Sequence, residues 1–168
     1  MKKCFVMVGI PAVGKSTFRG NIENSNEKSL FVYSTDDYIE EQAKAQNKTY
    51  TEVFTSVASK AKTHMDALLK DAIKEGTDIY WDQTNLSKGK RRKIINQMSK
   101  AGYEVACICF YPPSSKEELT EWHRRLDSRK DKTIPSHILK SMINSYEKPS
   151  VEEGFSEVKF YNTFGDKS

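Results

Sequence analysis

The segment GIPAVGKST, from Gly9 to Thr17, constrains the fold of this chain more than any other feature. It has the form GxxxxGKS and directly follows the apolar run Cys4 to Val8, which is typical of a buried parallel strand. A glycine-rich turn between such a strand and a helix aims backbone N–H groups at phosphate, and the helix N-terminus adds its dipole. The segment therefore predicts a binding site for a nucleoside triphosphate.

The side chains of this loop have separate expected roles. Lys15 is expected to reach the β- and γ-phosphates, and the Ser16 hydroxyl is expected to be a ligand of Mg²⁺. A glycine turn that holds no ligand is the alternative. The loop residues that we expect to contact the nucleotide are Gly9, Pro11, Ala12, Val13, Gly14, Lys15, Ser16 and Thr17.

Five β-rich apolar runs alternate with helical patterns along the chain. This alternation is typical of an α/β protein whose sheet is mostly parallel and is flanked by helices. A chain of 168 residues is long enough for a single domain with a sizeable core and too short for two, so we expect one domain over 1–168. The expected strands are Cys4–Gly9, Leu30–Ser34, Ile79–Trp81, Val105–Tyr111 and Val158–Tyr161.

The helical patterns have recognisable ends. Apolar residues recur at helical spacing from Tyr50 to Glu75, and Gly76 provides a C-cap. Ser115 and Glu118 resemble a capping box for a helix that runs to about Ser128. The other expected helices are Ser16–Asn26, Lys88–Ala101 and about Pro135–Tyr146.

Composition favours a cytoplasmic protein with reduced thiols. No apolar run approaches the length of a membrane span, and the initial MKK leads directly into a core strand instead of a cleavable signal segment. Cys4, Cys107 and Cys109 lie within expected strands, which indicates buried thiols and no disulfide framework. The net charge of +4 is compatible with a polyanionic substrate and does not identify one.

Asp36 is the candidate general base. It follows the second expected strand, at the carboxyl edge where ligands gather in open α/β sheets. A carboxylate at this edge can accept the proton of an incoming hydroxyl. The alternative is that Asp36 or Asp37 caps the helix that follows, and this interpretation suits Asp37 better.

Other polar residues complete the candidate site. Asp82 ends the third expected strand, where a carboxylate can hold the hydration shell of Mg²⁺; a plain polar turn is the alternative. Arg125 and Arg129 are four residues apart on one helical face, so both guanidinium groups could close on the γ-phosphate. They border a polar segment at about 127–134, where we expect a small mobile lid. Arg124 suits a solvated surface better.

The segment from Lys88 to Lys93 is the densest basic cluster. It either guides a phosphate backbone toward the site or forms the solvated first turn of a surface helix, and the sequence does not separate these two roles. The three histidines have no recognisable metal or nucleophile partner. Trp81 and Trp122 are expected in the core or along a groove.

Together these elements resemble the kinase domain of the 5′-hydroxyl polynucleotide kinase family, in its phage and animal repair types. The resemblance covers nearly the whole chain and runs through GIPAVGKST, the TDDY segment, WDQTNL, RRLDSRKDKTIPSHILKSM and KPSVEEGFSEVKF. It implies a P-loop kinase fold with a small lid. It also implies an ATP- and Mg²⁺-dependent kinase that phosphorylates the 5′-OH end of an RNA or DNA strand, as in nucleic-acid repair.

The resemblance also implies a role for each candidate residue. Lys15 and Ser16 would serve ATP and Mg²⁺, and Asp36 would be the general base. Asp82 would be a supporting carboxylate, with Mg²⁺ reached through water. Arg125 and Arg129 would be lid cations near the transferring phosphate, with Arg129 also contacting the nucleotide.

One position departs from the pattern of the phage enzymes. They carry an arginine three residues after the base that grips a phosphate of the acceptor, and here that position is Ile39. Two other hypotheses therefore stay open: a kinase of a nucleoside or other small metabolite and, more distantly, a nucleotide-gated binding module without turnover. The sequence also leaves open the oligomeric state and the purine preference of the donor site.

Overall fold

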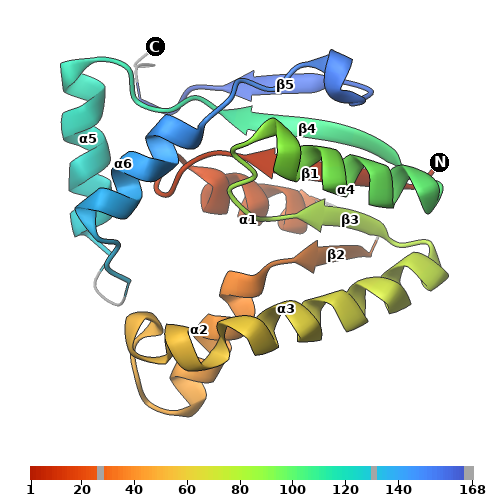
Figure 1. Ribbon diagram of the computed structural model, residues 1–168, viewed down its shortest axis with the longest axis horizontal. Coiled ribbons are helices and arrows are strands. Elements are labelled where there is room, and N and C mark those ends of the chain that lie inside the picture. The colour runs from red at the N-terminus through yellow and green to blue at the C-terminus, as the bar shows by residue number, and fades with distance from the viewer. Residues whose placement is uncertain (26–28, 130–131, 165–168) are drawn as a thin grey trace.

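Five parallel strands form the sheet, in the order β2-β3-β1-β4-β5 (Figure 1). The computed structural model describes residues 1–25, 29–129 and 132–164. Since every strand pair is parallel, all the carboxyl ends reach the same edge of the sheet. The predicted α/β fold with a five-stranded sheet is confirmed. The strands are β1 (Lys3–Val8), β2 (Leu30–Tyr33), β3 (Asp78–Trp81), β4 (Glu104–Phe110) and β5 (Val158–Tyr161).

Six α-helices and one short turn of 3₁₀ helix are found in the described ranges. The bounds of α3 agree with the prediction because Thr49 Oγ1 accepts the N–H of Glu52 and Gly76 adopts a left-handed φ of 70°. The first helix begins one residue earlier than expected, and Asn26, its expected end, lies outside the described residues. The elements are α1 (Lys15–Ser25), α2 (Thr35–Ala45), α3 (Tyr50–Glu75), α4 (Lys88–Lys100), α5 (Lys116–Asp127), α6 (Ser136–Ser145) and η1 (Val151–Glu153).

Two expectations about helix caps need correction. Ser34, and not Asp37, caps α2, because Ser34 Oγ accepts the N–H of Asp37 at 3.2 Å. Ser115 caps α5 as expected, by accepting the N–H of Glu118 at 3.1 Å. The Glu118 carboxylate, however, accepts the N–H of Ser114 at 3.0 Å, so the returning bond of the box is displaced by one residue.

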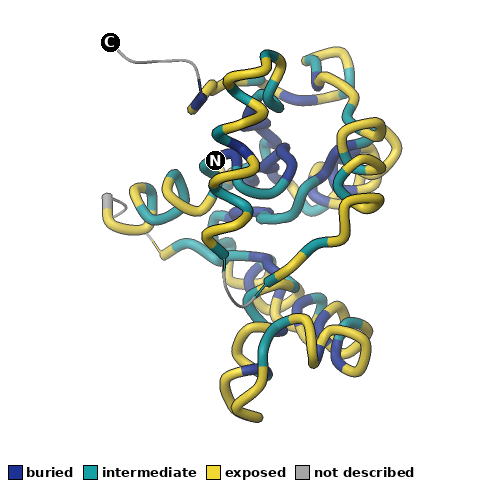
Figure 2. Tube along the Cα trace, turned by 90° about the vertical axis from the view of Figure 1, so that its left-hand side faces the viewer, coloured by how far each residue is buried: buried dark blue, intermediate teal, exposed yellow. Residues whose placement is uncertain are grey.

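Different helices cover the two faces of the sheet. Successive residues of β1 point to opposite faces, so that Val6 joins one apolar cluster and Met7 joins the other. The cluster around Val6 includes residues of α3 and α4, and the cluster around Met7 includes residues of α1, α5 and α6. In Figure 2 the buried positions gather at the centre, where the strands lie, and the outer turns of the helices are exposed.

The helices α2 and α3 pack on each other beyond β2, the strand at the edge of the sheet (Figure 1). The second half of α3 contributes Met65, Leu69 and Ala72 to the core of the sheet. The first half of α3 instead shares a separate apolar cluster with α2. This cluster consists of Ile39, Ala43, Val53, Val57 and Ala61.

The basic segment from Lys88 to Lys93 contains a buried arginine, which the sequence analysis treated as part of a solvated or phosphate-guiding face. Arg91 is 0% exposed. Its Nε and Nη2 donate to the carboxylate of Glu153 at 2.8 and 3.1 Å, and its Nη1 donates to the carbonyls of Asn85 and Leu86. Arg91 therefore ties α4 to η1 and, being fully buried, is not accessible to a phosphate backbone.

The cysteines and tryptophans are core residues. All three cysteines are buried and free, as predicted, and both tryptophans are buried. Among the helices of the described ranges, none combines the length and the apolar character that a membrane crossing needs.

Candidate active site

A cavity of about 890 Å³ opens at the carboxyl edge of the sheet. Its wall is built from the loop between β1 and α1, from α1 and α2, from the ends of β2 and β3, and from the segments after α5 and β5. Six of the predicted site residues that carry functional side chains line it. They are Lys15, Ser16, Asp36, Asp82, Arg125 and Arg129.

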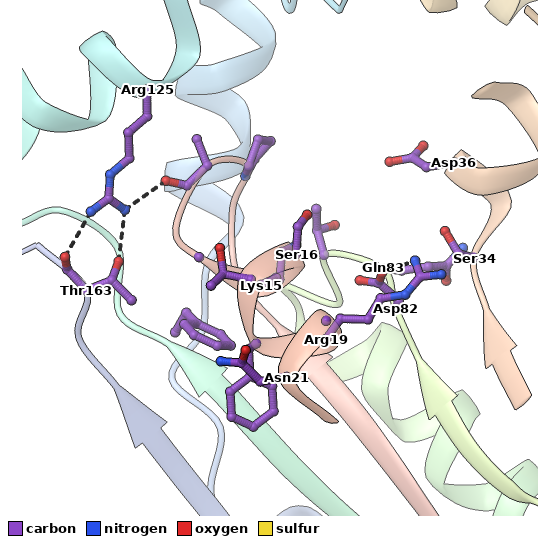
Figure 3. Close-up of a pocket in the computed structure, with 18 of the residues that line it drawn as sticks. Lys15, Ser16, Arg19, Asn21, Ser34, Asp36, Asp82, Gln83, Arg125 and Thr163 are labelled. Carbon is purple, nitrogen blue, oxygen red and sulfur yellow. Dashed lines mark hydrogen bonds and ion pairs between the residues drawn. The ribbon is translucent and has the colours of Figure 1, made fainter. Parts of the chain in front are cut away.

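The two sides of the cavity carry different groups. Figure 3 places Lys15 and Ser16 on the loop side and Asp36 across from them, with the Asp36 carboxylate directed into the space between. Asp82 lies at the end of β3 on the same floor as Arg19 of α1 (Figure 3). The fold therefore brings a phosphate-binding loop and a candidate base to one cavity.

The loop between β1 and α1 has the conformation of a phosphate cradle. Ala12 and Gly14 adopt positive φ values of 64° and 104°. A Cβ at Gly14 would lie 2.9 Å from Thr163 Cγ2, so only glycine fits there. Because the first turn of α1 contains no acidic side chain, its N–H donors face no competing carboxylate from that turn.

Two of the predicted loop residues do not line the cavity. Val13 is 1% exposed and packs in the apolar cluster around Met7. The N–H of Gly9 donates to the carbonyl of Thr84 at 3.0 Å, and its carbonyl accepts Lys15 Nζ at 2.6 Å. Their part is to shape the loop, whereas Pro11, Ala12, Gly14, Lys15, Ser16 and Thr17 line the cavity.

Four charged groups of the cavity act on the pKa of Lys15. Burial lowers its pKa to about 8, although the carboxylates of Asp82 and Asp36 act against this change. The positive charges of Lys132 and Arg129 lower the pKa further. All four groups therefore lie close enough to Lys15 to act also on a phosphate bound to its ammonium.

Arg19 connects α1 to the ends of two strands, and the sequence analysis missed it. Its guanidinium donates to both carboxylate oxygens of Asp37, at 3.0 and 2.6 Å, and to Asp82 Oδ2 at 3.2 Å. The available signal was its position four residues after Lys15, on the same face of α1. Burial raises the pKa of Asp82 against the opposing charges of Lys15 and Arg19.

Asp36 is half-exposed at the start of α2, and both of its carboxylate oxygens have partners. Tyr50 donates its hydroxyl to Oδ1 at 2.6 Å, and Lys132 donates Nζ to Oδ2 at 2.8 Å. Burial acts to raise the pKa of Asp36, but Lys132, Tyr50 and Lys15 outweigh it, and the pKa lies below its ordinary value. Asp36 is therefore an ionised carboxylate at neutral pH.

The two predicted lid arginines have different surroundings. Arg125 donates to the carbonyl of Ala12 at 3.2 Å and to Oγ1 and the carbonyl of Thr163, both at 2.9 Å (Figure 3). It thereby joins the phosphate loop to the segment after β5. Arg129 lines the cavity, and its side chain has no hydrogen bond or ion pair with the rest of the described chain. Two residues of the predicted lid, 130 and 131, lie outside the described residues.

The oxygen ligands at the cavity suit a magnesium ion that also binds the nucleotide. The Ser16 hydroxyl is exposed at the start of α1, and the Asp82 carboxylate lies at the end of β3. Both are the hard oxygen donors that Mg²⁺ prefers. Over the described ranges no three His, Cys, Asp or Glu side chains come together as a metal site, so further ligands would come from phosphate and water.

Comparison with known proteins identifies a family. Residues 5–149 match the family described as the AAA domain, so the match covers most of the chain, from within β1 into the segment after α6.

Solved structures share the fold at low sequence identity. A protein of Chloroflexus aurantiacus described as a kinase has 14% identity and a TM-score of 0.68, with 98% of this chain and 86% of that chain covered. Kti12 of Chaetomium thermophilum, solved in complex with ADP-AlF3, has 14% identity and a TM-score of 0.61, with 98% and 91% covered. A structure from the PezAT toxin-antitoxin system of Streptococcus pneumoniae has 14% identity and a TM-score of 0.65, with 96% and 67% covered.

Proposed function

The chain belongs to the AAA domain family, and from that premise we propose that it is an ATP-dependent kinase that transfers the γ-phosphoryl group to a hydroxyl. The observation that carries the proposal is the position of Lys15 and Asp36 on opposite sides of one cavity. A phosphate loop alone would bind a nucleotide. An ionised carboxylate opposite that loop can also activate an acceptor hydroxyl for attack on the bound nucleotide.

The donor side binds the triphosphate through backbone and cationic groups. The N–H groups at the start of α1 receive the β-phosphate, and Lys15, whose pKa of about 8 leaves it protonated at neutral pH, pairs with the β- and γ-phosphates. Arg129 has a free guanidinium within the described chain and neutralises charge on the transferring group. Bound Mg²⁺, held by Ser16 and through water by Asp82, would neutralise phosphate charge and orient the γ-phosphoryl group.

The acceptor side supplies the base. Asp36 takes the proton of the acceptor hydroxyl as its oxygen bonds to the γ-phosphorus, and the bond from that phosphorus to the β–γ bridging oxygen breaks. ADP is the leaving group. Arg19 holds Asp37 and Asp82 and so fixes the start of α2, from which Asp36 projects.

The proposed acceptor is the 5′-hydroxyl end of a polynucleotide strand. This finer statement depends on the TDDY and WDQTNL segments and on the arginine-bearing stretch from Arg124 to Met142, which resemble that kinase family. A net charge of +4 is compatible with such a polyanion.

A small hydroxyl compound is the second candidate, and specific features of α2 favour it. Ile39, at the position of the phage acceptor arginine, is 2% exposed and packs between α2 and α3. The α2 side of the cavity instead presents Glu40, which has no ion pair within the described residues, beside the paired carboxylates of Asp36 and Asp37, and its charge repels the phosphates of a strand.

One labelling experiment tests the reaction and separates the acceptors. The protein is incubated with γ-labelled ATP and Mg²⁺, together with 5′-hydroxyl DNA and RNA oligonucleotides or with nucleosides and small alcohols. Label on oligonucleotides supports a polynucleotide strand as the acceptor. Label on small acceptors, in a reaction that added oligonucleotides do not inhibit, supports the second candidate. Tight ATP binding without any labelled product would overturn the kinase proposal and favour a nucleotide-gated binding module.

The matched variant in that experiment is Asp36→Asn, which keeps the shape of the side chain and removes its basicity. We expect it to lose turnover by about 10²-fold or more while it still binds nucleotide. Loss of nucleotide binding in this variant would make Asp36 a structural residue and remove the base from the mechanism.

A further inference from the structure

Each oxygen of the Asp36 carboxylate has a partner from a distant part of the chain. Tyr50 is the first residue of α3, and its hydroxyl occupies Oδ1 at 2.6 Å. Lys132 lies between α5 and α6, and its ammonium occupies Oδ2 at 2.8 Å. A carboxylate has about four acceptor sites, so each oxygen keeps room for an acceptor hydroxyl. The two contacts do lower the pKa of Asp36, and loss of the Lys132 ammonium would make Asp36 a stronger base.

Lys132 is held by more than its ion pair. Its ammonium also lies 4.3 Å from the centre of the Tyr50 ring, a cation–π distance. The adjacent residue, Thr133, donates its N–H to Thr51 Oγ1 at 3.4 Å. As a result the Lys132 side chain is 15% exposed, against 52% for the Asp36 side chain. The contact is therefore specific, and it joins the segment after α5 to the start of α3.

Lys132 is also close enough to the phosphate loop to act there. Its positive charge lowers the pKa of Lys15, as that of Arg129 does, and both side chains line the same cavity. Of the two partners of Asp36, Lys132 has the long flexible side chain, whereas Tyr50 is the first residue of α3, a helix that Thr49 caps. The mobile partner is therefore Lys132.

From these contacts we propose that Lys132 is a shared cation that pairs with Asp36 and moves to the γ-phosphate when ATP binds. The proposal rests on the kinase function proposed above and adds a catalytic lysine to it. A γ-phosphate carries more negative charge than one carboxylate and so competes for the ammonium. Its departure makes the carboxylate a stronger base for the acceptor proton, while Tyr50 keeps Oδ1 and holds the carboxylate in place. Donor binding thereby strengthens the base.

The test measures nucleotide binding and needs no acceptor. Calorimetry with Mg²⁺ gives the Kd for ADP and for the imido analogue of ATP, and the ratio of the two isolates the contribution of the γ-phosphate. The variants are Lys132→Met, Asp36→Asn and their double variant. Lys140→Met, which removes an exposed lysine of α6 outside the cavity, is the control.

The exchange predicts a specific pattern in these ratios. Lys132→Met lowers the preference for the triphosphate about tenfold, because the phosphate loses a cation. Asp36→Asn raises the preference about fivefold, because the ammonium no longer has to leave a carboxylate. In the double variant the Asp36 substitution has no further effect, and the ratio equals that of Lys132→Met. Lys140→Met keeps the ratio of the unmodified protein.

Two results overturn the exchange. One is an unchanged ratio in Lys132→Met; the other is an Asp36→Asn effect of the same size with and without Lys132. Binding of ADP in every variant reports that the variant is folded. Because the ratio needs no turnover, a chain that shows the pattern but labels no acceptor would refute the kinase and keep the shared cation. A chain that labels an acceptor but does not show the pattern would support the kinase and refute the shared cation.

Discussion

Asp36 and Asp37 are neighbours in the sequence and have unrelated surroundings. Consecutive residues of a helix point about 100° apart, so the two carboxylates at the start of α2 face different groups. Both carboxylates line the cavity, but Asp37 accepts two hydrogen bonds from the Arg19 guanidinium, whereas Asp36 accepts Tyr50 and Lys132. Asp37 therefore holds α1 to α2, and Asp36 is the carboxylate that we propose as the base.

Arg129→Ala is expected to lower kcat about 10²-fold or more, because its guanidinium, which has no partner among the described residues, is proposed to neutralise charge on the transferring phosphoryl group. The measurement is steady-state kinetics with the acceptor that takes label. Arg124→Ala is the matched control, since Arg124 is exposed and pairs with Glu121 on the surface of α5. An unchanged kcat in Arg129→Ala would remove this residue from the mechanism.

Nucleotide affinity is expected to fall above pH 8. Lys15 must be protonated to pair with phosphate, and burial lowers its pKa to about 8 in the chain as described. Below that pH the ammonium is already present. Above it, binding must first take up a proton, so Kd rises by up to about tenfold per pH unit. Calorimetry from pH 7 to 9.5 measures this. Lys15→Arg, which stays charged, should bind more weakly and show no such slope.

At the residue scale, the sequence predicted which residues line the cavity where a motif has a fixed spacing, and it missed partners that are distant in the chain. Lys15, Ser16 and Asp36 were found because each follows an apolar strand at a known offset. Tyr50 and Lys132 were missed as partners of Asp36, because they lie 14 and 96 residues away and carry no local pattern. Contacts of this kind depend on the packing of elements, which a local pattern does not encode.

At the element scale, the join between α4 and η1 depends on the buried pair of Arg91 and Glu153. Arg91→Met is expected to destabilise the fold by about 3 kcal/mol or more, because it leaves the Glu153 carboxylate and two carbonyls without their donor. Urea unfolding measures the change. Arg92→Met alters the exposed neighbour and should cost less than about 0.5 kcal/mol. Equal losses in the two variants would contradict the structural role of Arg91.

Element bounds were predictable where local chemistry determines them. The ends of α3 agree with the prediction because a threonine cap and a left-handed glycine act within one turn of each end. The burial of Arg91 was not predictable, since charged residues in a helix usually face solvent and its partner Glu153 lies 62 residues later. The capping box at α5 was predicted one residue out of place, because the Glu118 carboxylate accepts the N–H of Ser114 and not that of Ser115.

At the scale of the whole molecule, α3 belongs to two different cores. Backbone amides near Val57 and Ala61 are therefore expected to exchange with solvent at least about tenfold faster than those near Leu69 and Ala72. The reason is that the first pair is supported by the small α2–α3 cluster, and the second pair by the core of the sheet. Hydrogen exchange measured by NMR checks this difference. Uniform rates along α3 would mean that the helix opens as one unit with the sheet.

The fold class was predictable from the alternation of strands and helices, and the strand order was not. An apolar run indicates each strand in the sequence. The positions of β3 and β4 beside β1, however, depend on how the crossover segments pack between distant parts of the chain. The same limit explains why α2 and α3 were not predicted to form a separate pair. Their shared face is apolar in both helices, and nothing in either pattern says which surface covers it.

The meeting of Thr163 with the phosphate loop has a consequence for biosynthesis. Its hydroxyl donates to the carbonyl of Val13 at 2.8 Å, across 150 positions of sequence, and Arg125 bridges the same two segments. On the ribosome, these contacts with the proposed nucleotide cradle can form only after Thr163 has left the exit tunnel. The cradle is therefore completed late, after the other strands of the sheet have emerged.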